Sequence, residues 1–269
     1  WGNLAESSGY VKGGVVMIIP GMVSATFREK TADDIIRLCK EADLQAVEWS
    51  ENAHVMPGDP EGAAELLKKT QMAGLTVAAY GSYYRLGQNE DPKTVFQASL
   101  VSAKELKAPL IRIWAGTKPS LEVSDEEVRA LAREAAVIGE MAEAEGIKIA
   151  FEWHKNTLTD TNESATNLLN LADQDNLYCL WQPTVALSME ERCEGLRLLR
   201  ERNRLLNLHI YYWLDGVRRP LREGVEEWSR YLSQVDEKEN RFGLLEFVMG
   251  NTEEQFLEDA KTLHEILKN

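Results

Sequence analysis

Four short apolar runs of this chain end in a polar side chain that could bind a metal ion or move a proton. Glu152 ends IKIAFE, Gln182 follows LYCLW, His209 lies in LLNLHIYYW and Glu246 ends GLLE. Carboxylate, amide and imidazole groups together suit Mg²⁺ or Mn²⁺, and the imidazole also admits Co²⁺ or Zn²⁺. A carboxylate in such a site can also take up or return a proton. Burying a polar group at the end of a strand costs free energy unless the group is paired. The four residues occupy the same place in successive strand–helix units, so we expect them to meet at one shared site.

Other polar and aromatic residues occur at or just after the ends of apolar runs, and they indicate a sugar site. Sugar C–H faces stack on aromatic rings, while hydroxyls exchange strong hydrogen bonds with charged groups. His154 lies two residues after Glu152, so on an extended strand the two side chains point the same way. The predicted substrate-binding residues are Glu48, His54, Tyr83, Arg112, Trp114, His154 and Arg219.

Each candidate taken alone also has a purely structural interpretation. Glu152 or Glu246 could form a salt bridge across a folded core, and a single buried histidine such as His209 is more often a satisfied core residue than a ligand. Gln182 precedes Pro183 and could be a turn residue. The joint interpretation as a site rests on the equivalent place of all four in consecutive strand–helix units.

The elements that must position these residues can be predicted from the hydrophobic pattern. Amphipathic helical segments separate the apolar runs, with Thr31, Ser124, Thr161 and Thr252 at predicted helix starts. Eight strand–helix units predict an α/β chain folded as a single (β/α)8 TIM barrel. A doubly wound sheet is the alternative, but neither GxGxxG nor a P-loop follows the first run. The predicted strands are 22–27, 46–49, 76–80, 110–114, 148–152, 177–181, 206–211 and 243–247.

Composition narrows the class of protein and its partners. The formal net charge of −14 argues against nucleic-acid or anionic membrane partners. No apolar run approaches the roughly 18 residues of a membrane-spanning helix. The three cysteines lack CxxC spacing, which favours free thiols and a cytoplasmic location. Residues 1–16 have no clear periodicity, so we expect an N-terminal extension there and the barrel domain over 17–269.

At these residues the chain resembles the xylose isomerase-like TIM barrels, a superfamily of sugar isomerases and epimerases. The resemblance runs from about Met22 to the C-terminus and is closest to the sugar phosphate isomerase/epimerase branch, in AVEWSENAHVMPGD, FEWHKNTLTDT and LLEFVMGNTEEQFLEDAKTL. Ketose 3-epimerases of this superfamily hold a divalent metal with Glu, Asp, His and Glu, and the matching positions look like Glu152, Gln182, His209 and Glu246. Gln182 replaces the aspartate and adds no negative charge, which predicts weaker metal binding.

The resemblance implies an enzyme of carbohydrate metabolism, a sugar isomerase or epimerase acting on a small ketose or sugar phosphate. It implies metal-assisted proton transfer through an enediolate, with Glu152 and Glu246 as the catalytic acid and base and Mn²⁺, Mg²⁺, Co²⁺ or Zn²⁺ as cofactor. Relatives are often homo-oligomers, so self-association is a further expectation. Two alternatives stay open: an enolate-type dehydratase of the inosose or dehydroshikimate class, and a non-catalytic carbohydrate-binding barrel that has lost its metal.

Overall fold

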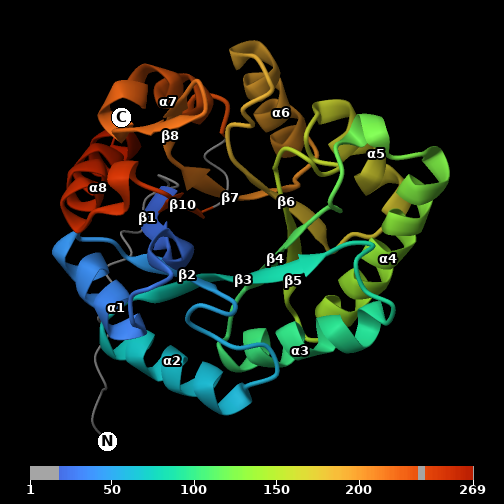
Figure 1. Cartoon of the computed structure of the whole chain (residues 1–269), viewed down its shortest axis with the longest axis horizontal. Helices are drawn as coiled ribbons and strands as arrows, with labels where there is room; N and C mark the ends of the chain where they lie inside the picture. Colours follow the sequence, from blue (N-terminus) through green and yellow to red (C-terminus); the bar gives the residue numbers. More distant parts are fainter. Residues whose placement is uncertain (1–17, 236–239, 269) are drawn as a thin grey trace, which may run out of the picture.

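The computed structural model describes residues 18–235 and 240–268. A closed barrel of parallel strands lies at its centre, in the order β1-β10-β7-β6-β5-β4-β3-β2. Helices α1 to α8 form a ring around the strands (Figure 1). This architecture confirms the predicted single-domain (β/α)8 barrel. The expected extension over residues 1–16 lies outside the described residues.

The elements follow one another as strand and helix around the barrel. The barrel strands are β1 Ile18–Val23, β2 Ala46–Ser50, β3 Thr76–Arg85, β4 Leu110–Trp114, β5 Lys148–Glu152, β6 Leu177–Trp181, β7 Leu205–Ile210 and β10 Arg241–Leu245. The helices are α1 Ala32–Glu41, α2 Pro60–Met72, α3 Pro92–Glu105, α4 Asp125–Glu143, α5 Asn162–Ala172, α6 Met189–Glu201, α7 Val225–Leu232 and α8 Glu253–Leu267. Short 3-10 helices are η1 Ser24–Phe27, η2 Ser120–Glu122, η3 Leu221–Gly224 and η4 Met249–Asn251.

The first strand lies earlier in the chain than its sequence predicts. The expected strand over 22–27 is wrong, because β1 ends at Val23 and residues 24–27 form η1. The Pro20-Gly21 pair reads as a break, yet Gly21 is required inside the strand. A Cβ at Gly21 would lie 2.6 Å from the Ala46 carbonyl oxygen of β2, so only glycine allows the two strands to pair this closely.

Helix starts agree with the sequence because their capping side chains are present. Thr31 and Ser124 each form a capping box at the start of α1 and α4. Thr161 and Thr252 each accept a hydrogen bond from the backbone N–H three residues later. These bonds satisfy N–H groups that a helix leaves unpaired, and they fix where α5 and α8 begin.

The barrel interior is narrow and changes from apolar to charged along its axis. Small or branched apolar side chains pack inside the barrel: Val23, Ala46, Ala78, Ala79, Leu110, Ala150, Leu180 and Leu244. Two residues further along their strands, on the same face, stand the charged or amide residues Glu48, Arg112, Glu152, Gln182 and Glu246. The sequence period of two therefore places one polar layer above an apolar floor, at the C-terminal end of the strands.

A small hairpin that the sequence analysis did not predict follows β7. Its strands are β8 Tyr212–Leu214 and β9 Val217–Arg219, which pair antiparallel. Asp215 and Gly216 connect them, both with positive φ (51° and 77°), the conformation of a tight two-residue hairpin turn. The hairpin brings β9 back beside the end of β7, and so adds side chains to the mouth of the barrel.

Two further expectations can be compared with the described residues. The cysteines are free, and burial raises the pKa of both the Cys39 and the Cys179 thiol to about 12. Among the helices that the structure describes, none is both long and apolar enough to cross a membrane.

Candidate active site

The structure brings together the side chains proposed as metal ligands. Glu152 ends β5, Gln182 directly follows β6, His209 lies in β7 and Glu246 directly follows β10. One ligand atom from each of Glu152, His209 and Glu246 lies within 4.8 Å of the other two. Gln182 Nε2 donates a hydrogen bond of 2.9 Å to Glu152 Oε1. All four side chains are buried, so they form one polar cluster on the barrel axis.

A buried ion-pair network holds the Glu152 side of this cluster. Arg112 Nε lies 3.2 Å from Glu152 Oε2 and 3.2 Å from Glu48 Oε1. Arg112 Nη1 also donates to the Ser82 carbonyl at 2.8 Å. A Cβ at Gly81 would lie 2.7 Å from Glu48 Oε1 and 2.9 Å from Arg112 Nη2, so glycine makes room for this pair. Removing one member of such a buried network is costly, because it leaves an unpaired charge.

Glu48 determines which nitrogen of His209 faces the site. His209 Nε2 lies 3.0 Å from Glu48 Oε2, while Nδ1 lies 3.4 Å from Glu246 Oε2. Burial would lower the pKa of His209, but the charges of Glu246 and Glu48 outweigh it and raise the pKa to about 10. Burial would raise the pKa of Glu48, but His209 and Arg112 outweigh it and lower that pKa. Without a metal ion the ring of His209 therefore carries both protons at neutral pH, and a metal ion would displace the one on Nδ1. With Nε2 donating to Glu48, the lone pair of the neutral ring is then on Nδ1, toward Glu246.

The residues present fit a divalent metal ion. Within the part of the chain that the structure describes, His209 Nδ1 and Gln182 Oε1 are buried atoms without a hydrogen-bond partner. Such atoms normally have one, and a cation would satisfy both. With neutral His209, the three carboxylates of the cluster exceed its one guanidinium by two negative charges. A divalent ion balances that charge, and the donor set of carboxylate, imidazole and amide oxygens is suitable for it.

A small cavity opens above the cluster at the C-terminal end of the strands. Its volume is about 110 Å³, and it is lined by Glu152, Gln182 and Glu246 together with the aromatic rings of Tyr211 and Trp213. Phe247 and His154 also line it, and Tyr211 donates a hydrogen bond to the Pro183 carbonyl at 3.1 Å. Carboxylates below and aromatic rings at the sides suit a small polyhydroxylated compound.

Other predicted substrate contacts lie at the rim. Tyr83 and Trp114 pack together with ring centroids 5.5 Å apart. The Trp114 ring also lies under the buried guanidinium of Arg112, 4.5 Å from its Cζ. His154 Nδ1 is 2.6 Å from the Lys155 carbonyl oxygen, which fixes its ring at the edge of the cavity. Tyr83, Trp114 and His154 therefore surround the polar layer, whereas Arg112 is part of it.

Two predicted substrate-binding residues are not brought to the cluster. His54 Nε2 lies 3.0 Å from the Lys30 carbonyl oxygen, and its ring packs on Trp49. Arg219 donates to Glu223 through Nε at 2.8 Å and Nη2 at 3.0 Å. Among the described residues, no hydrogen bond, ion pair or ring contact joins either side chain to the four clustered residues. Neighbouring residues of a strand face opposite sides, so only one arginine of β9 can face the barrel mouth.

The side chain of β9 that does face the mouth is Arg218. The sequence indicates that one arginine of the 218–219 pair holds substrate oxygens, and the predicted contacts name Arg219. The Cζ of Arg218 lies 4.6 Å from the centroid of the Phe247 ring, and Arg28 reaches the same ring from η1. The Asp215-Gly216 pair directly after an apolar stretch is a hairpin signal. Reading it would have indicated which of the two arginines faces inward.

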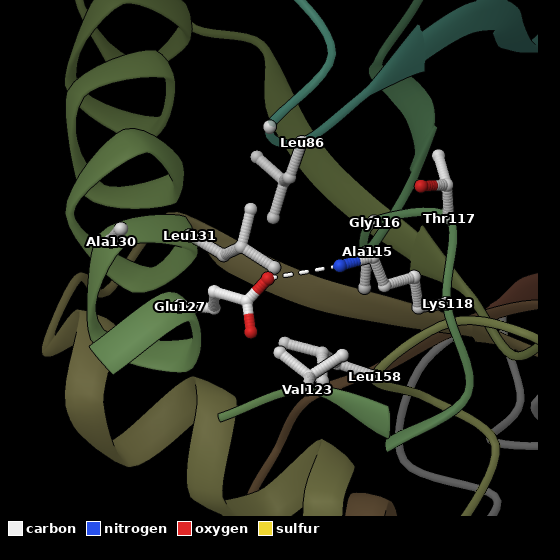
Figure 2. Close-up of a pocket in the computed structure, with 11 residues that line it drawn as sticks. Leu86, Ala115, Gly116, Thr117, Lys118, Val123, Glu127, Ala130, Leu131 and Leu158 are labelled. Carbon is white, nitrogen blue, oxygen red and sulfur yellow. Dashed lines mark hydrogen bonds and ion pairs between the residues drawn. The ribbon is translucent and has the colours of Figure 1, made fainter. Parts of the chain in front are cut away.

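A second cavity of about 250 Å³ lies between the ends of β3, β4 and β5 and helix α4. Figure 2 shows the side chains of Leu86, Leu131 and Leu158 around an ion pair between Lys118 and Glu127, whose atoms are 3.0 Å apart. This cavity contains none of the candidate residues. Its two charges already neutralise each other, so it offers little for proton transfer.

Comparisons with known proteins agree with this fold. The family model described as xylose isomerase-like TIM barrel matches residues 36–266, so the chain belongs to that family. A search of curated proteins gives no match.

Solved structures of similar fold include both sugar epimerases and a dehydratase. The probable 3-DHS dehydratase AsbF from Bacillus anthracis has a TM-score of 0.74 and 20% identity, over 92% of this chain and 99% of that one. D-allulose 3-epimerase from Methylomonas sp., in complex with D-allulose, has a TM-score of 0.70 and 12% identity, over 94% of this chain and 97% of that one. The IolI protein with a bound zinc atom has a TM-score of 0.69 and 16% identity, over 93% of this chain and 98% of that one. At these identities the likeness shows the fold.

Proposed function

We propose that this protein is a sugar isomerase or epimerase that moves a proton at a carbon next to a carbonyl group. The observation that carries the proposal is the convergence of Glu152, His209 and Glu246 within 4.8 Å. They lie at the C-terminal end of the barrel strands, where enzymes of this fold act. Neighbours of the same fold that are described as D-allulose 3-epimerase and L-ribulose 3-epimerase support the reaction class.

In this proposal Glu246 removes the proton. Its carboxylate pairs with His209 Nδ1 at 3.4 Å. Its carboxylate faces the cavity, where a substrate C–H can approach it. The electron pair of the broken C–H bond moves toward the carbonyl oxygen and gives an enediolate. A carboxylate positioned in this way typically contributes about 10²–10⁴-fold in rate.

In an epimerase, Glu152 in its protonated form gives a proton to the opposite face of the same carbon, and Glu246 then loses its proton to solvent while Glu152 regains one from solvent. In an isomerase, Glu246 returns the proton that it removed to the neighbouring carbon. Arg112 and Gln182 fix the direction of the Glu152 carboxylate. Glu152, Gln182, His209 and Glu246 would hold a divalent ion such as Mn²⁺, Mg²⁺, Co²⁺ or Zn²⁺. When bound, that ion would polarise the carbonyl and lower the energy of the enediolate.

Glu48 has a positioning role in this proposal, in place of the substrate contact predicted from the sequence. Both of its oxygens are engaged, one by Arg112 and one by His209, and the side chain is fully buried. It therefore orients His209 and compensates the charge of Arg112 from beneath the cavity.

The test is incorporation of solvent deuterium into a panel of ketohexoses, pentuloses and their phosphates in D₂O with Mn²⁺. We expect deuterium at one carbon next to the carbonyl with the wild-type protein, and none above background with Glu246→Gln. Absence of deuterium from every carbon of every compound would contradict proton transfer. Loss of water from a substrate, seen by mass spectrometry, would assign the same enolate chemistry to a dehydratase instead. Sugar binding without exchange or loss of water would favour a carbohydrate-binding barrel.

A further inference from the structure

Arginines gather at the mouth of the barrel although the protein as a whole is strongly acidic, with a formal net charge of −14. Arg28 follows η1, and Arg218 lies in β9, on the inward side of the hairpin. Their hydrogen-bond partners are neutral: Arg28 Nε donates to the Tyr83 hydroxyl at 2.9 Å, and Arg218 Nη1 donates to Asn251 Oδ1. Within the part of the chain that the structure describes, neither guanidinium forms an ion pair with a carboxylate.

Both guanidinium groups are placed on one aromatic ring beside the catalytic cavity. The centroid of the Phe247 ring lies 5.8 Å from Arg28 Cζ and 4.6 Å from Arg218 Cζ. Phe247 directly follows Glu246 and lines the same cavity. Two loops far apart in the sequence thus bring positive charge to a ring that borders the proposed base.

The backbone at Phe247 supports a functional reason for this arrangement. Its φ is 49°, in the left-handed region that bulky side chains rarely adopt. A hydrogen bond of 3.2 Å from the Phe247 N–H to Thr26 Oγ1 holds it there. Such strain concentrates at ligand sites. Here it keeps the ring between two arginines at the cavity edge.

The rim carries a further cation on the other side of Tyr83. Arg85 Cζ lies 4.1 Å from the centroid of the Trp114 ring, and Trp114 packs on Tyr83. Stacking on a ring leaves the N–H edge of a guanidinium free to bind an oxyanion. The mouth of the barrel therefore has a basic rim above an acidic floor.

We propose that Arg28 and Arg218 bind an anionic group of the substrate, a phosphate monoester or a carboxylate, at the end remote from the reacting carbon. This inference rests on the proposed function, because it assigns the substrate class of the same site. Guanidinium groups bind phosphate and carboxylate through paired, charge-assisted hydrogen bonds. The anion is held above the cavity, and the carbonyl end of the compound is directed down to Glu152 and Glu246.

The experiment measures binding by isothermal titration calorimetry with matched probes. Inorganic phosphate and D-fructose 6-phosphate test the phosphate source, shikimate tests the carboxylate source, and D-fructose is the neutral reference. The variants are Arg28→Gln and Arg218→Gln. Arg219→Gln is the matched control, because Arg219 is adjacent in sequence but forms its ion pair with Glu223.

We expect the wild type to bind phosphate or the carboxylate, with D-fructose 6-phosphate or shikimate at least about tenfold tighter than D-fructose. Arg28→Gln and Arg218→Gln should each lower the affinity for that anion by about tenfold or more, the value of one charge-assisted hydrogen bond. Arg219→Gln should lower it by less than about twofold. Thermal unfolding checks that all three variants fold. No anion binding by the wild type, or equal effects in the Arg218 and Arg219 variants, would overturn the proposal.

The outcome also separates this inference from the proposed function. If the protein exchanges deuterium into a neutral sugar, and Arg28→Gln and Arg218→Gln do not change that exchange rate, the result would contradict the proposed anion site and support proton transfer. If an anion binds and the binding depends on these arginines, but no compound exchanges deuterium, the result would support the anion site and contradict proton transfer.

Discussion

The two carboxylates at the centre of the site have different surroundings, although each ends a strand of the same barrel. Glu152 is held from two sides, by Arg112 at 3.2 Å and by Gln182 at 2.9 Å. Glu246 pairs with His209 at 3.4 Å and lines the cavity. One carboxylate is fixed and charge-compensated, and the other is available to the cavity.

This difference indicates a division of labour. The donors around Glu152 hold its carboxylate in one direction. Glu246 lines the cavity and, among the described residues, pairs with one polar group, so a substrate C–H can approach its carboxylate. The surroundings therefore favour Glu246 as the base and Glu152 as the oriented partner, a distinction that residue types alone could not make.

The largest expected effect is that of Glu246→Gln. The amide keeps the shape of the side chain but cannot take up a proton, so the exchange rate should fall by about 10²–10⁴-fold. Deuterium incorporation at saturating Mn²⁺ measures the rate, which separates the loss of the base from weaker metal binding. An exchange rate within a few-fold of the wild-type rate would show that Glu246 is not the base.

Removing the charge that positions His209 should mainly weaken metal binding. Loss of a hydrogen-bond partner behind a metal-binding histidine typically costs about 10–100-fold in metal affinity. We expect that loss for Glu48→Gln in calorimetric titration with Mn²⁺. The control is Glu51→Gln, since Glu51 is also buried but accepts hydrogen bonds from Tyr80 and Ser99 instead. Equal affinities in the two variants would show that Glu48 does not orient the imidazole.

We expect Tm to fall more for Glu152→Gln than for Glu246→Gln, although Glu246→Gln has the largest expected effect on the exchange rate. Glu152→Gln removes one charge from the Arg112 network, and a hydrogen bond to a charged group is worth about 1.5–3 kcal/mol. A protein of this size loses about 2–4 °C in Tm per kcal/mol, so thermal unfolding of the metal-free variant should show a clear decrease. Glu246→Gln removes a single pair, with His209 Nδ1 at 3.4 Å, so its Tm should fall by less. Equal decreases in both variants would contradict the asymmetry.

The smallest expected effect comes from restoring a negative charge opposite Glu246. Gln182→Glu keeps the side-chain length and adds a carboxylate, and ligand charge count raises the affinity of a site for divalent ions. We expect Mn²⁺ to bind on the order of tenfold more tightly in calorimetry. The metal-free variant should unfold at a lower temperature, because the new charge repels Glu152 beside it. Unchanged Mn²⁺ affinity would mean that position 182 does not face the ion.

The sequence predicted those strands best whose ends are marked by polar residues. The predicted bounds of β4, β5 and β6 agree with the structure because each is a short, mostly apolar run that stops at a charged, amide or turn residue. The first strand was predicted to begin at Met22, whereas β1 includes Pro20 and Gly21, where the close approach of β2 requires the glycine.

The site was predictable as a set of residue types but not as a network. Equivalent positions at strand ends placed Glu152, His209 and Glu246 near one another. The contact of Glu48 with His209 joins residues 161 positions apart, and no local pattern shows it. Which of two adjacent arginines faces inward depends on the hairpin register, which the sequence analysis did not include.

The most direct test of the account is a crystal structure of the protein grown with Mn²⁺, with the ion located by its anomalous scattering. We predict one ion bonded to Glu152, to His209 through Nδ1 and to Glu246, with the Gln182 amide oxygen turned toward it. A protein whose polar layer contains no ion at saturating Mn²⁺, with His209 still bound between Glu48 and Glu246, would contradict a metal-assisted proton-transfer site.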